Sequence, residues 1–300
     1  PRIPVKKKIW WSKYGATLKT DHGVFAVRMA ANQVIGAPEQ WFKMNKANNF
    51  TEFMEAVKME QGPRMTIVYG DKEGNIYQLS NGLVPKRRPG FNWAGIVRGD
   101  TSATLWTEFE PVEALPQQLN PACGFVFNVN NSPFEASCKG KNLNYEHYNP
   151  LMGYGKTKKN RSERFYELMA QHGDELITWE DFLEIKYDDV YPDSMVFSSG
   201  INLNDIWEID TERYPELADV LENIHNWNKQ ASIENTDATV LLIAIYHIFD
   251  EMNNPVKNYR NDKIASHELF VEALTTAKKW LLEHYGTIDV PLGDIQRLIR

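Results

Sequence analysis

The 300-residue sequence has no excess of basic residues, and this argues against one broad class of function. Its formal net charge is -7 and its isoelectric point is near 5.6. Nucleic-acid binding needs a concentrated basic surface. The basic clusters here are residues 6–8 and 156–164, and neither has interleaved aromatic side chains. We therefore expect both clusters to be solvated and predict no nucleic-acid partner.

Long apolar runs are absent as well. The nearest candidate, residues 240–248, is far shorter than the ~20 residues that a helix needs to cross a bilayer. No signal peptide is recognisable. The sequence starts at Pro1 rather than at a methionine, which indicates a processed product or a piece of a longer protein. The sequence therefore predicts no membrane partner and carries little targeting information of its own.

Cysteine is scarce, with only Cys123 and Cys138 in the chain. Their spacing fits neither a CxxC redox motif nor a zinc site, which needs four ligands. A disulfide is compatible with the spacing if the protein is exported, and two reduced thiols are equally compatible. The sequence leaves these two states open and predicts no metal bound through cysteine.

Several motifs of catalysis and cofactor binding are missing. There is no GxSxG nucleophile elbow, no HExxH zinc motif among the seven histidines, and no P-loop or GxGxxG. Acidic pairs at residues 180–181 and 188–189 are explained by solvation, so they do not indicate a glycosidase. We predict no metal and no cofactor, and nucleotide binding through the usual loops is disfavoured.

The most informative stretch is residues 120–133, which begins and ends with a proline-containing turn. A residue before proline is pushed towards extended geometry, so we expect Asn120 to be extended. Two-residue alternation between the turns predicts a strand with one apolar face and one face that ends in carboxamides. An asparagine there could hold a backbone turn or donate a hydrogen bond to an oxyanion, and the residues alone leave both roles open. The apolar face would carry Phe125, Phe127 and Val129, and the other face Val126, Asn128 and Asn130.

Periodicity and turn signals predict strands and helices before residue 86. Asn49 is a candidate helix cap, and Gly74 can supply the positive φ of a hairpin turn. Residues 86–119 are predicted to form a long surface connection, with Trp93 and Trp106 as packing anchors. The predicted elements are a hairpin at 9–19 turning near Gly15, a strand at 24–29, helices at 39–46 and after Asn49, and a hairpin of strands 65–70 and 75–80.

The character of the sequence changes after Pro133. Residues 134–160 are polar and contain glycine, which indicates a connector and a boundary. Thr178 and Asp181 resemble a capping box, which predicts that a helix opens there. The predicted helices of this part are residues 161–172, 178–187, 214–229, 236–252 and 267–284.

Separate motifs recur in the order found in one known family. Residues 120–131 fit the pattern Asn-Pro-x-x-Gly-Phe followed by an apolar residue and, after three positions, Asn-Asn. Residues 69–76 fit Tyr-x-Asp-x-x-Gly-Asn-Ile, and residues 13–15 match a turn of the family. From near Ile9 to past Arg161 the sequence therefore resembles the β chain of the penicillin acylase family of N-terminal-nucleophile hydrolases.

The resemblance implies an α+β fold, as part of an αββα sandwich followed by a mostly helical region. Residues 1–133 would belong to the acylase core and include the oxyanion-asparagine strand, residues 134–160 would be a connector, and residues 161–300 would be a mostly helical β-chain region. The implied partners are the α chain and the remaining β-chain segments of one precursor, which processes itself autocatalytically. The implied location is periplasmic or secreted.

The resemblance also implies a chemistry, the hydrolysis of a linear amide between an acyl group and an amine. Antibiotics of the penicillin class, acyl-homoserine lactones and other N-acyl compounds lie within the family's range. A serine at the start of the β chain attacks the amide, and its α-amino group, with an ordinary pKa of about 8, serves as the base.

Four residues match functional positions of the family. Asn130 matches the oxyanion asparagine, while its neighbour Asn131 is expected to hold the turn. Arg161 matches an arginine that starts a helix and orients the asparagine and the substrate; the alternative is a surface ion pair. Trp41 and Met65 match positions that line the acyl-side pocket, and the alternative for both is core packing.

Two departures from the family pattern shape the prediction. No residue here matches the nucleophilic serine, so we expect an internal piece of the β chain that is inactive alone. The family's calcium ligand would fall near residues 141–144, where no carboxylate stands, so no metal is predicted. The competing hypotheses are a non-catalytic homologue or ligand-binding module that lost the serine and, with less support, catalysis by the secondary amine of Pro1.

Overall fold

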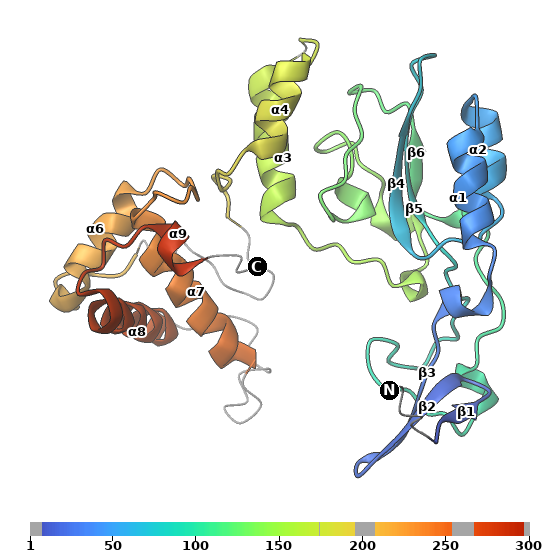
Figure 1. Cartoon of the computed structure of the whole chain (residues 1–300), viewed down its shortest axis with the longest axis horizontal. Helices are drawn as coiled ribbons and strands as arrows, with labels where there is room; N and C mark the ends of the chain where they lie inside the picture. Colours follow the sequence, from blue (N-terminus) through green and yellow to red (C-terminus); the bar gives the residue numbers. More distant parts are fainter. Residues whose placement is uncertain (1–7, 174, 196–207, 254–266, 297–300) are drawn as a thin grey trace, which may run out of the picture. The chain divides into compact units, whose positions relative to one another are not determined.

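The computed structural model describes residues 8–173, 175–195, 208–253 and 267–296. The chain forms two compact units, Pro1–Lys156 and Thr157–Arg300. The first unit combines helices with two small sheets, and the described part of the second is helical (Figure 1), which confirms the α+β class. No helix among these residues has the length and apolar character needed to span a membrane.

The first sheet is built from the hairpin and strand predicted at the start of the chain. It contains β1 (Trp10–Ser12), β2 (Gly15–Thr20) and β3 (Gly23–Val27) in the antiparallel order β1-β2-β3. Ser12 pairs with Gly15, so the first turn lies directly before that glycine. Gly15 has a φ of 129°, and a Cβ there would lie 2.4 Å from the Val27 carbonyl oxygen. This close approach requires glycine.

The second sheet contains the other predicted hairpin, β4 (Met65–Gly70) and β5 (Ile76–Asn81), in register with Tyr69 opposite Tyr77. The Asp71 carboxylate accepts hydrogen bonds at 2.9 Å from Asn75 N–H, Asn75 Nδ2 and the Tyr69 hydroxyl. A third strand, β6 (Gln117–Leu119), pairs with β5. It was not predicted, because three residues are too few to show a period.

Two helices pack on the second sheet: α1 (Ala37–Lys46) and α2 (Phe50–Val57), which lie side by side along it in Figure 1. The Asn49 side chain accepts from Glu52 N–H at 2.9 Å, which confirms the predicted cap. Burial of one apolar stripe of α2 against the sheet drives this packing. The buried core of the unit is Phe53, Val57, Ile67, Tyr77, Leu79, Val84, Val112, Leu115 and Met152.

The connection 86–119 contains short helical turns and the two predicted anchors. Trp93 and Trp106 are half-buried, and each ring contacts an arginine, at 5.8 Å from Arg87 and 4.4 Å from Arg28. The 3-10 turns of the first unit are η1 (Ala30–Gln33), η2 (Ser102–Thr104), η3 (Val112–Ala114), η4 (Pro133–Glu135), η5 (Tyr145–His147) and η6 (Pro150–Met152).

The predicted strand between the turns of residues 120–133 is wrong. Phe127 N–H pairs with the Ala136 carbonyl at 3.0 Å, but no ladder follows, since Asn130 leaves extended geometry with a φ of 62°. The predicted difference in burial is present without the strand, because Phe127 is buried and Asn130 is exposed. Asn120 is not extended either; its φ is 49°, because its carboxamide accepts from Ile76 N–H at 2.8 Å and fixes a left-handed turn.

In the second unit the described residues form helices around a separate core. Thr178 caps its helix through Asp181 N–H at 3.2 Å, and Asp181 bonds back to Thr178 N–H at 2.8 Å, which confirms the capping box. Helices α6, α7 and α8 share one buried apolar cluster. The helices are α3 (Asn160–His172), α4 (Trp179–Tyr187), η7 (Pro215–Leu217), α6 (Ala218–Asn226), α7 (Asp237–Asn253), α8 (His267–Tyr285) and α9 (Leu292–Ile295).

Candidate functional site

Asn130 lies at the exposed tip of a turn in the first unit, in left-handed geometry. Few residues with a side chain adopt this geometry, and asparagine is among those that tolerate it. Its N–H donates to Asn128 Oδ1 at 3.0 Å, and Val129 N–H donates to Asn131 Oδ1 at 2.8 Å. Two flanking carboxamides therefore fix the backbone on which Asn130 stands.

Asn131 holds the far side of the same turn. Its Nδ2 donates to the carbonyl oxygens of Ser132 at 3.2 Å and Glu135 at 2.6 Å, while its Oδ1 accepts from Val129 N–H. This confirms the prediction that Asn131 holds the turn next to Asn130. The next residue extends the anchoring, because Ser132 Oγ donates to the Gly155 carbonyl at 2.6 Å.

A disulfide closes the base of the segment that carries Asn130. Cys123 and Cys138 are bonded, which decides between the two states left open by the sequence. The fully buried Ser137 donates from its hydroxyl to the Phe125 carbonyl at 3.0 Å, beside the disulfide. Linking the two ends of the segment reduces the number of conformations that its loop can adopt.

Trp41 and Met65, matched to acyl-side positions, line one pocket of about 230 Å³. The pocket lies between α1 and β4, and both side chains remain partly exposed, at 44% and 37%. Core packing would bury them, so the partial exposure favours a lining role. A small apolar cleft of this kind suits a short or planar apolar group. Its apolar lining comes from Trp41, Met44, Phe53, Met65, Ile67 and Val68.

Two buried amides in the pocket wall were missed by the sequence interpretation. Gln40 Oε1 accepts from Gln61 N–H at 2.7 Å, and its Nε2 donates to the Val57 carbonyl at 3.3 Å. Asn81 Nδ2 donates to the Pro63 carbonyl at 3.5 Å. These bonds position the chain around Gly62 against the pocket. The hydrogen-bond partners of the two amides lie 17 to 21 residues away in sequence, so no local pattern could have marked them.

Arg161 lies in the first turn of α3, where it is exposed. The helix begins at Asn160, and the Ser162 hydroxyl donates to the Lys159 carbonyl at 2.8 Å. The expectation that Arg161 stands at the start of a helix is thus confirmed. It belongs to the second unit and Asn130 to the first, so their proposed joint role stays a prediction.

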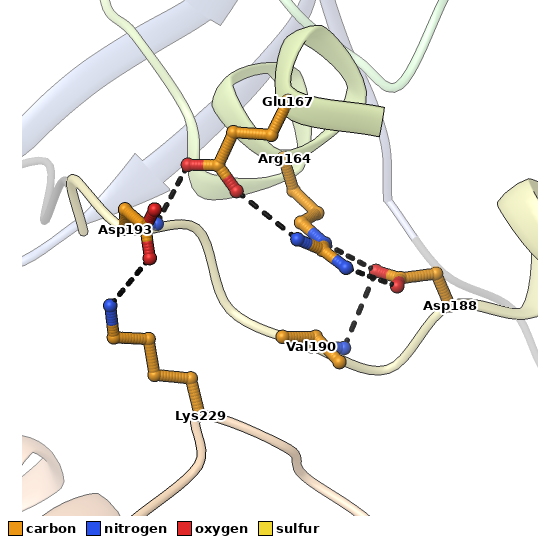
Figure 2. Close-up of polar contacts among 6 residues, drawn as sticks. All are labelled: Arg164, Glu167, Asp188, Val190, Asp193 and Lys229. Atoms are coloured by element: carbon orange, nitrogen blue, oxygen red, sulfur yellow. Dashed lines mark hydrogen bonds and ion pairs between the residues drawn. The ribbon is translucent and has the colours of Figure 1, made fainter. Parts of the chain in front are cut away.

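A charged network holds the helix that carries Arg161 (Figure 2). Arg164, one turn further along α3, makes a bidentate pair with Asp188, at 2.9 and 2.7 Å, and donates to Glu167 at 3.2 Å. Glu167 accepts from Asp193 N–H at 2.7 Å, and the Asp193 carboxylate pairs with Lys229 at 2.7 Å. The network links α3 to residues 188–193 and to the loop before α7.

The charges in this network stabilise one another. The hydrogen bond to Asp188 is the main cause of a raised pKa for Arg164, and the hydrogen bond from Lys229 is the main cause of a lowered pKa for Asp193. The Arg164 and Asp188 side chains are only 17% and 13% exposed, so solvent screens their pairing less than that of a surface pair. The Arg164 guanidinium therefore stays charged at neutral pH.

Within the described ranges no three His, Cys, Asp or Glu side chains come close enough together to hold a metal ion. The side chains that bond to the backbone of the turn around Asn130 are instead carboxamides, those of Asn128 and Asn131.

Comparison with known families gives the affiliation. A sequence model described as penicillin amidase matches residues 2–298. The chain belongs to the penicillin amidase family. This confirms the resemblance noted from the motifs and extends it over nearly the whole chain, including the helical second unit.

Two relatives show how much of a family member the chain covers and which fold it shares. It is 28% identical over 129 residues to a penicillin G acylase of Escherichia coli. That alignment covers 42% of this chain and 15% of the other protein. A structure of the thermostable penicillin G acylase from Alcaligenes faecalis in orthorhombic form aligns with a TM-score of 0.60 and 17% identity. That alignment covers 95% of this chain and 60% of the other, which shows a shared fold. The chain thus spans less than two thirds of either relative.

Proposed function

We propose that this chain is part of an acylase that hydrolyses a linear amide between an acyl group and an amine. The observation that carries the proposal is the fixed turn that presents Asn130, in a chain of the penicillin amidase family. An oxyanion is stabilised best by a donor whose position is set before the reaction, because no reorganisation is then needed. The flanking carboxamides give the Asn130 backbone that fixed position.

In the proposed reaction the nucleophile is an N-terminal serine supplied by a segment outside this chain. Its Oγ attacks the carbonyl carbon, and its own α-amino group takes the hydroxyl proton. The carbonyl oxygen becomes an oxyanion, to which the Asn130 amide donates. Collapse of the intermediate expels the amine with that proton, and water then hydrolyses the acyl ester and restores the serine.

The other matched residues take supporting roles in this proposal. Trp41 and Met65 contact the acyl group in the pocket between α1 and β4, with the Gln40 and Asn81 amides holding the pocket wall. Arg161 orients the oxyanion asparagine and the substrate, and the Arg164 network holds the helix on which Arg161 stands. No cofactor takes part, since the amine and the amide donor suffice.

The proposed partners are the α chain and the remaining β-chain segments of the same precursor, processed autocatalytically in the periplasm or after secretion. Together they would complete an αββα sandwich around the second sheet. The surface of the first unit supports this, because Trp11, Leu18 and Val68 are all apolar and exposed, on strands of both sheets. Strands of this kind stay soluble best when another segment covers them.

Asn130→Ala in the longer protein that contains this chain tests the proposal. Loss of one oxyanion donor predicts a fall in kcat of roughly a hundredfold or more, with little change in folding. The matched control is Asn144→Ala, another exposed asparagine of the first unit, which accepts a single backbone bond from Glu146. Release of amine from an N-acyl amide is the readout. Equal turnover in both variants would reject the assignment and favour a non-catalytic, ligand-binding homologue.

A further inference from the structure

A second and larger cavity lies in the first unit, apart from the pocket at Trp41 and Met65. Its volume is about 990 Å³, and it opens between the face of the β2–β3 hairpin and the connection at residues 93–106. Figure 1 shows this connection beside β1, β2 and β3. The Tyr14 hydroxyl lies 2.9 Å from Thr104 Oγ1 and ties the hairpin to the connection. The two pockets share no lining residue.

Arg28 projects from the end of β3 into the wall of this cavity. Its Nη1 donates to the Lys13 carbonyl at 3.1 Å, its Nη2 donates to the Trp106 carbonyl at 3.0 Å, and its guanidinium stacks over the Trp106 ring. The Nε–H is buried and has no hydrogen-bond partner. Buried polar groups are almost always paired in a functional state, so this donor calls for an acceptor.

Arg87 contributes a second guanidinium to the same cavity. Its Nη1 donates to the Leu151 carbonyl at 2.9 Å, and the group lies over the Trp93 ring. Burial, and to a smaller extent the charge of Arg64, lowers the pKa of Arg87, which means that its positive charge lacks compensation. Among the residues that the structure describes, neither Arg28 nor Arg87 forms an ion pair with a carboxylate.

Asp100 supplies the carboxylate in the cavity lining, and Arg98 already forms an ion pair with it. Asp100 pairs with Arg98 at 2.6 Å, through two hydrogen bonds on the exposed rim. The cavity therefore holds two uncompensated guanidinium groups. Indole rings lie next to both of them, and Val24, Phe25 and Val97 add apolar wall. A volume of this size is typical of small-molecule sites.

We propose that this cavity binds an organic anion with a flat apolar body, such as an aromatic carboxylate. The carboxylate of the anion would pair with the guanidinium groups of Arg28 and Arg87, and its body would lie against the Trp93 and Trp106 indoles that line the same cavity. Guanidinium groups bind carboxylates through paired, charge-assisted hydrogen bonds, and these are strong where solvent is partly excluded. The site is independent of the acylase reaction, because it uses none of the residues assigned to that reaction.

The test is calorimetric titration of the 300-residue chain with 2-naphthoate. Naphthalene-2-methanol, which has the same body without the charge, is the matched ligand control. Arg28→Gln and Arg87→Gln are the variants, and Arg88→Gln is the matched control, since Arg88 is exposed and does not line the cavity. Far-UV circular dichroism establishes that each variant is folded. If Arg28→Gln does not fold, Arg87→Gln decides alone.

The proposal predicts that 2-naphthoate binds and that the neutral alcohol does not. Either arginine variant should raise Kd by about tenfold or more, the loss typical of a hydrogen bond to a charged group, and Arg88→Gln should leave Kd unchanged. Raising the salt from about 0.05 to about 0.5 M should weaken binding. No binding of 2-naphthoate, equal binding of the alcohol, or an unchanged Kd in the folded arginine variants would overturn the proposal.

Discussion

Asp71 shows how one side chain can organise a turn. Its carboxylate accepts three hydrogen bonds within the β4–β5 hairpin, and the bond from the Asn75 side chain is the main cause of a lowered pKa. A carboxyl whose pKa is lower in the folded than in the unfolded state stabilises the folded state at pH values above its unfolded pKa. This stabilisation is lost as the pH falls through the folded pKa.

We therefore predict that the hairpin loses stability as the pH falls below 3.8, the ordinary pKa of an aspartate carboxyl. We also predict that Asn75→Ala raises the pKa of Asp71 towards that value. An NMR titration of the Asp71 carboxyl carbon measures both. Asn144→Ala, which removes a side chain that bonds to Glu146 N–H and not to Asp71, should leave the titration unchanged. An Asp71 pKa that stays the same in Asn75→Ala would show that the amide is not the cause.

The pocket at Trp41 and Met65 gives a second prediction for single residues. The proposed function predicts that, in the longer protein that contains this chain, Trp41→Ala and Met65→Ala lower kcat/KM for an arylacetyl amide by about tenfold or more, because apolar contact with the acyl group is lost. The acetyl amide, which is too small to use the pocket fully, should change much less. Met29→Ala is the control, since Met29 is exposed and lies outside the pocket. Equal losses for both amides would indicate a folding defect instead of a pocket.

At the scale of elements, the Arg164 network determines how firmly α3 is held. Arg164→Gln breaks a half-buried bidentate pair, so the cost should lie between the roughly 1 kcal/mol of an exposed pair and the roughly 3 kcal/mol of a buried one. The thermal unfolding midpoint of the helices, followed by circular dichroism, should fall by several degrees.

Arg98→Gln is the matched control for this prediction. It breaks another bidentate pair with an aspartate, but one whose side chains are 76% and 64% exposed, so its effect should be small. Equal midpoints for Arg164→Gln and the unchanged protein would mean that the network adds nothing to the stability of α3.

Elements with local signals were predicted well from the sequence. The caps at Asn49 and Thr178 and the hairpin turn at Gly74 depend on residues within four positions of one another, and all three are confirmed. Residues 125–130 were predicted wrongly as a strand, because alternating burial arises there without a pairing partner. Whether a segment finds a partner depends on tertiary structure, which alternation does not encode.

The residues of the candidate site likewise divide into those that the sequence predicted and those that it did not. Trp41, Met65, Asn130 and Arg161 were singled out through the family motifs, and the structure brings the first two into one pocket. The buried amides of Gln40 and Asn81 and the Arg164 network were not predicted. Their partners lie far away in sequence, so no local pattern marks them.

At the scale of the whole molecule, the chain consists of two units with separate cores. The segment between Met152 and Asn160 has no regular structure, and Lys156, Lys158 and Lys159 are exposed within it. Proteases prefer exposed segments without hydrogen-bonded structure. Limited trypsin digestion should therefore cut at these lysines and leave two protected fragments, which mass spectrometry identifies.

A variant with all three lysines replaced by glutamine provides the control for this digestion. It should lose the cut between the units while other cuts keep their rates. If neither of the two fragments is found in the unchanged protein, or if both are degraded together, the two-unit description would be contradicted.

The account of the whole molecule depends most on where the nucleophile comes from. The N-terminal sequence of the native polypeptide that contains residues 1–300, isolated from its source cells, measures this directly. The account predicts a serine, at a position before the present Pro1, exposed by cleavage of a precursor. A native polypeptide that begins at Pro1 would contradict the N-terminal serine mechanism for this chain and would favour a ligand-binding homologue.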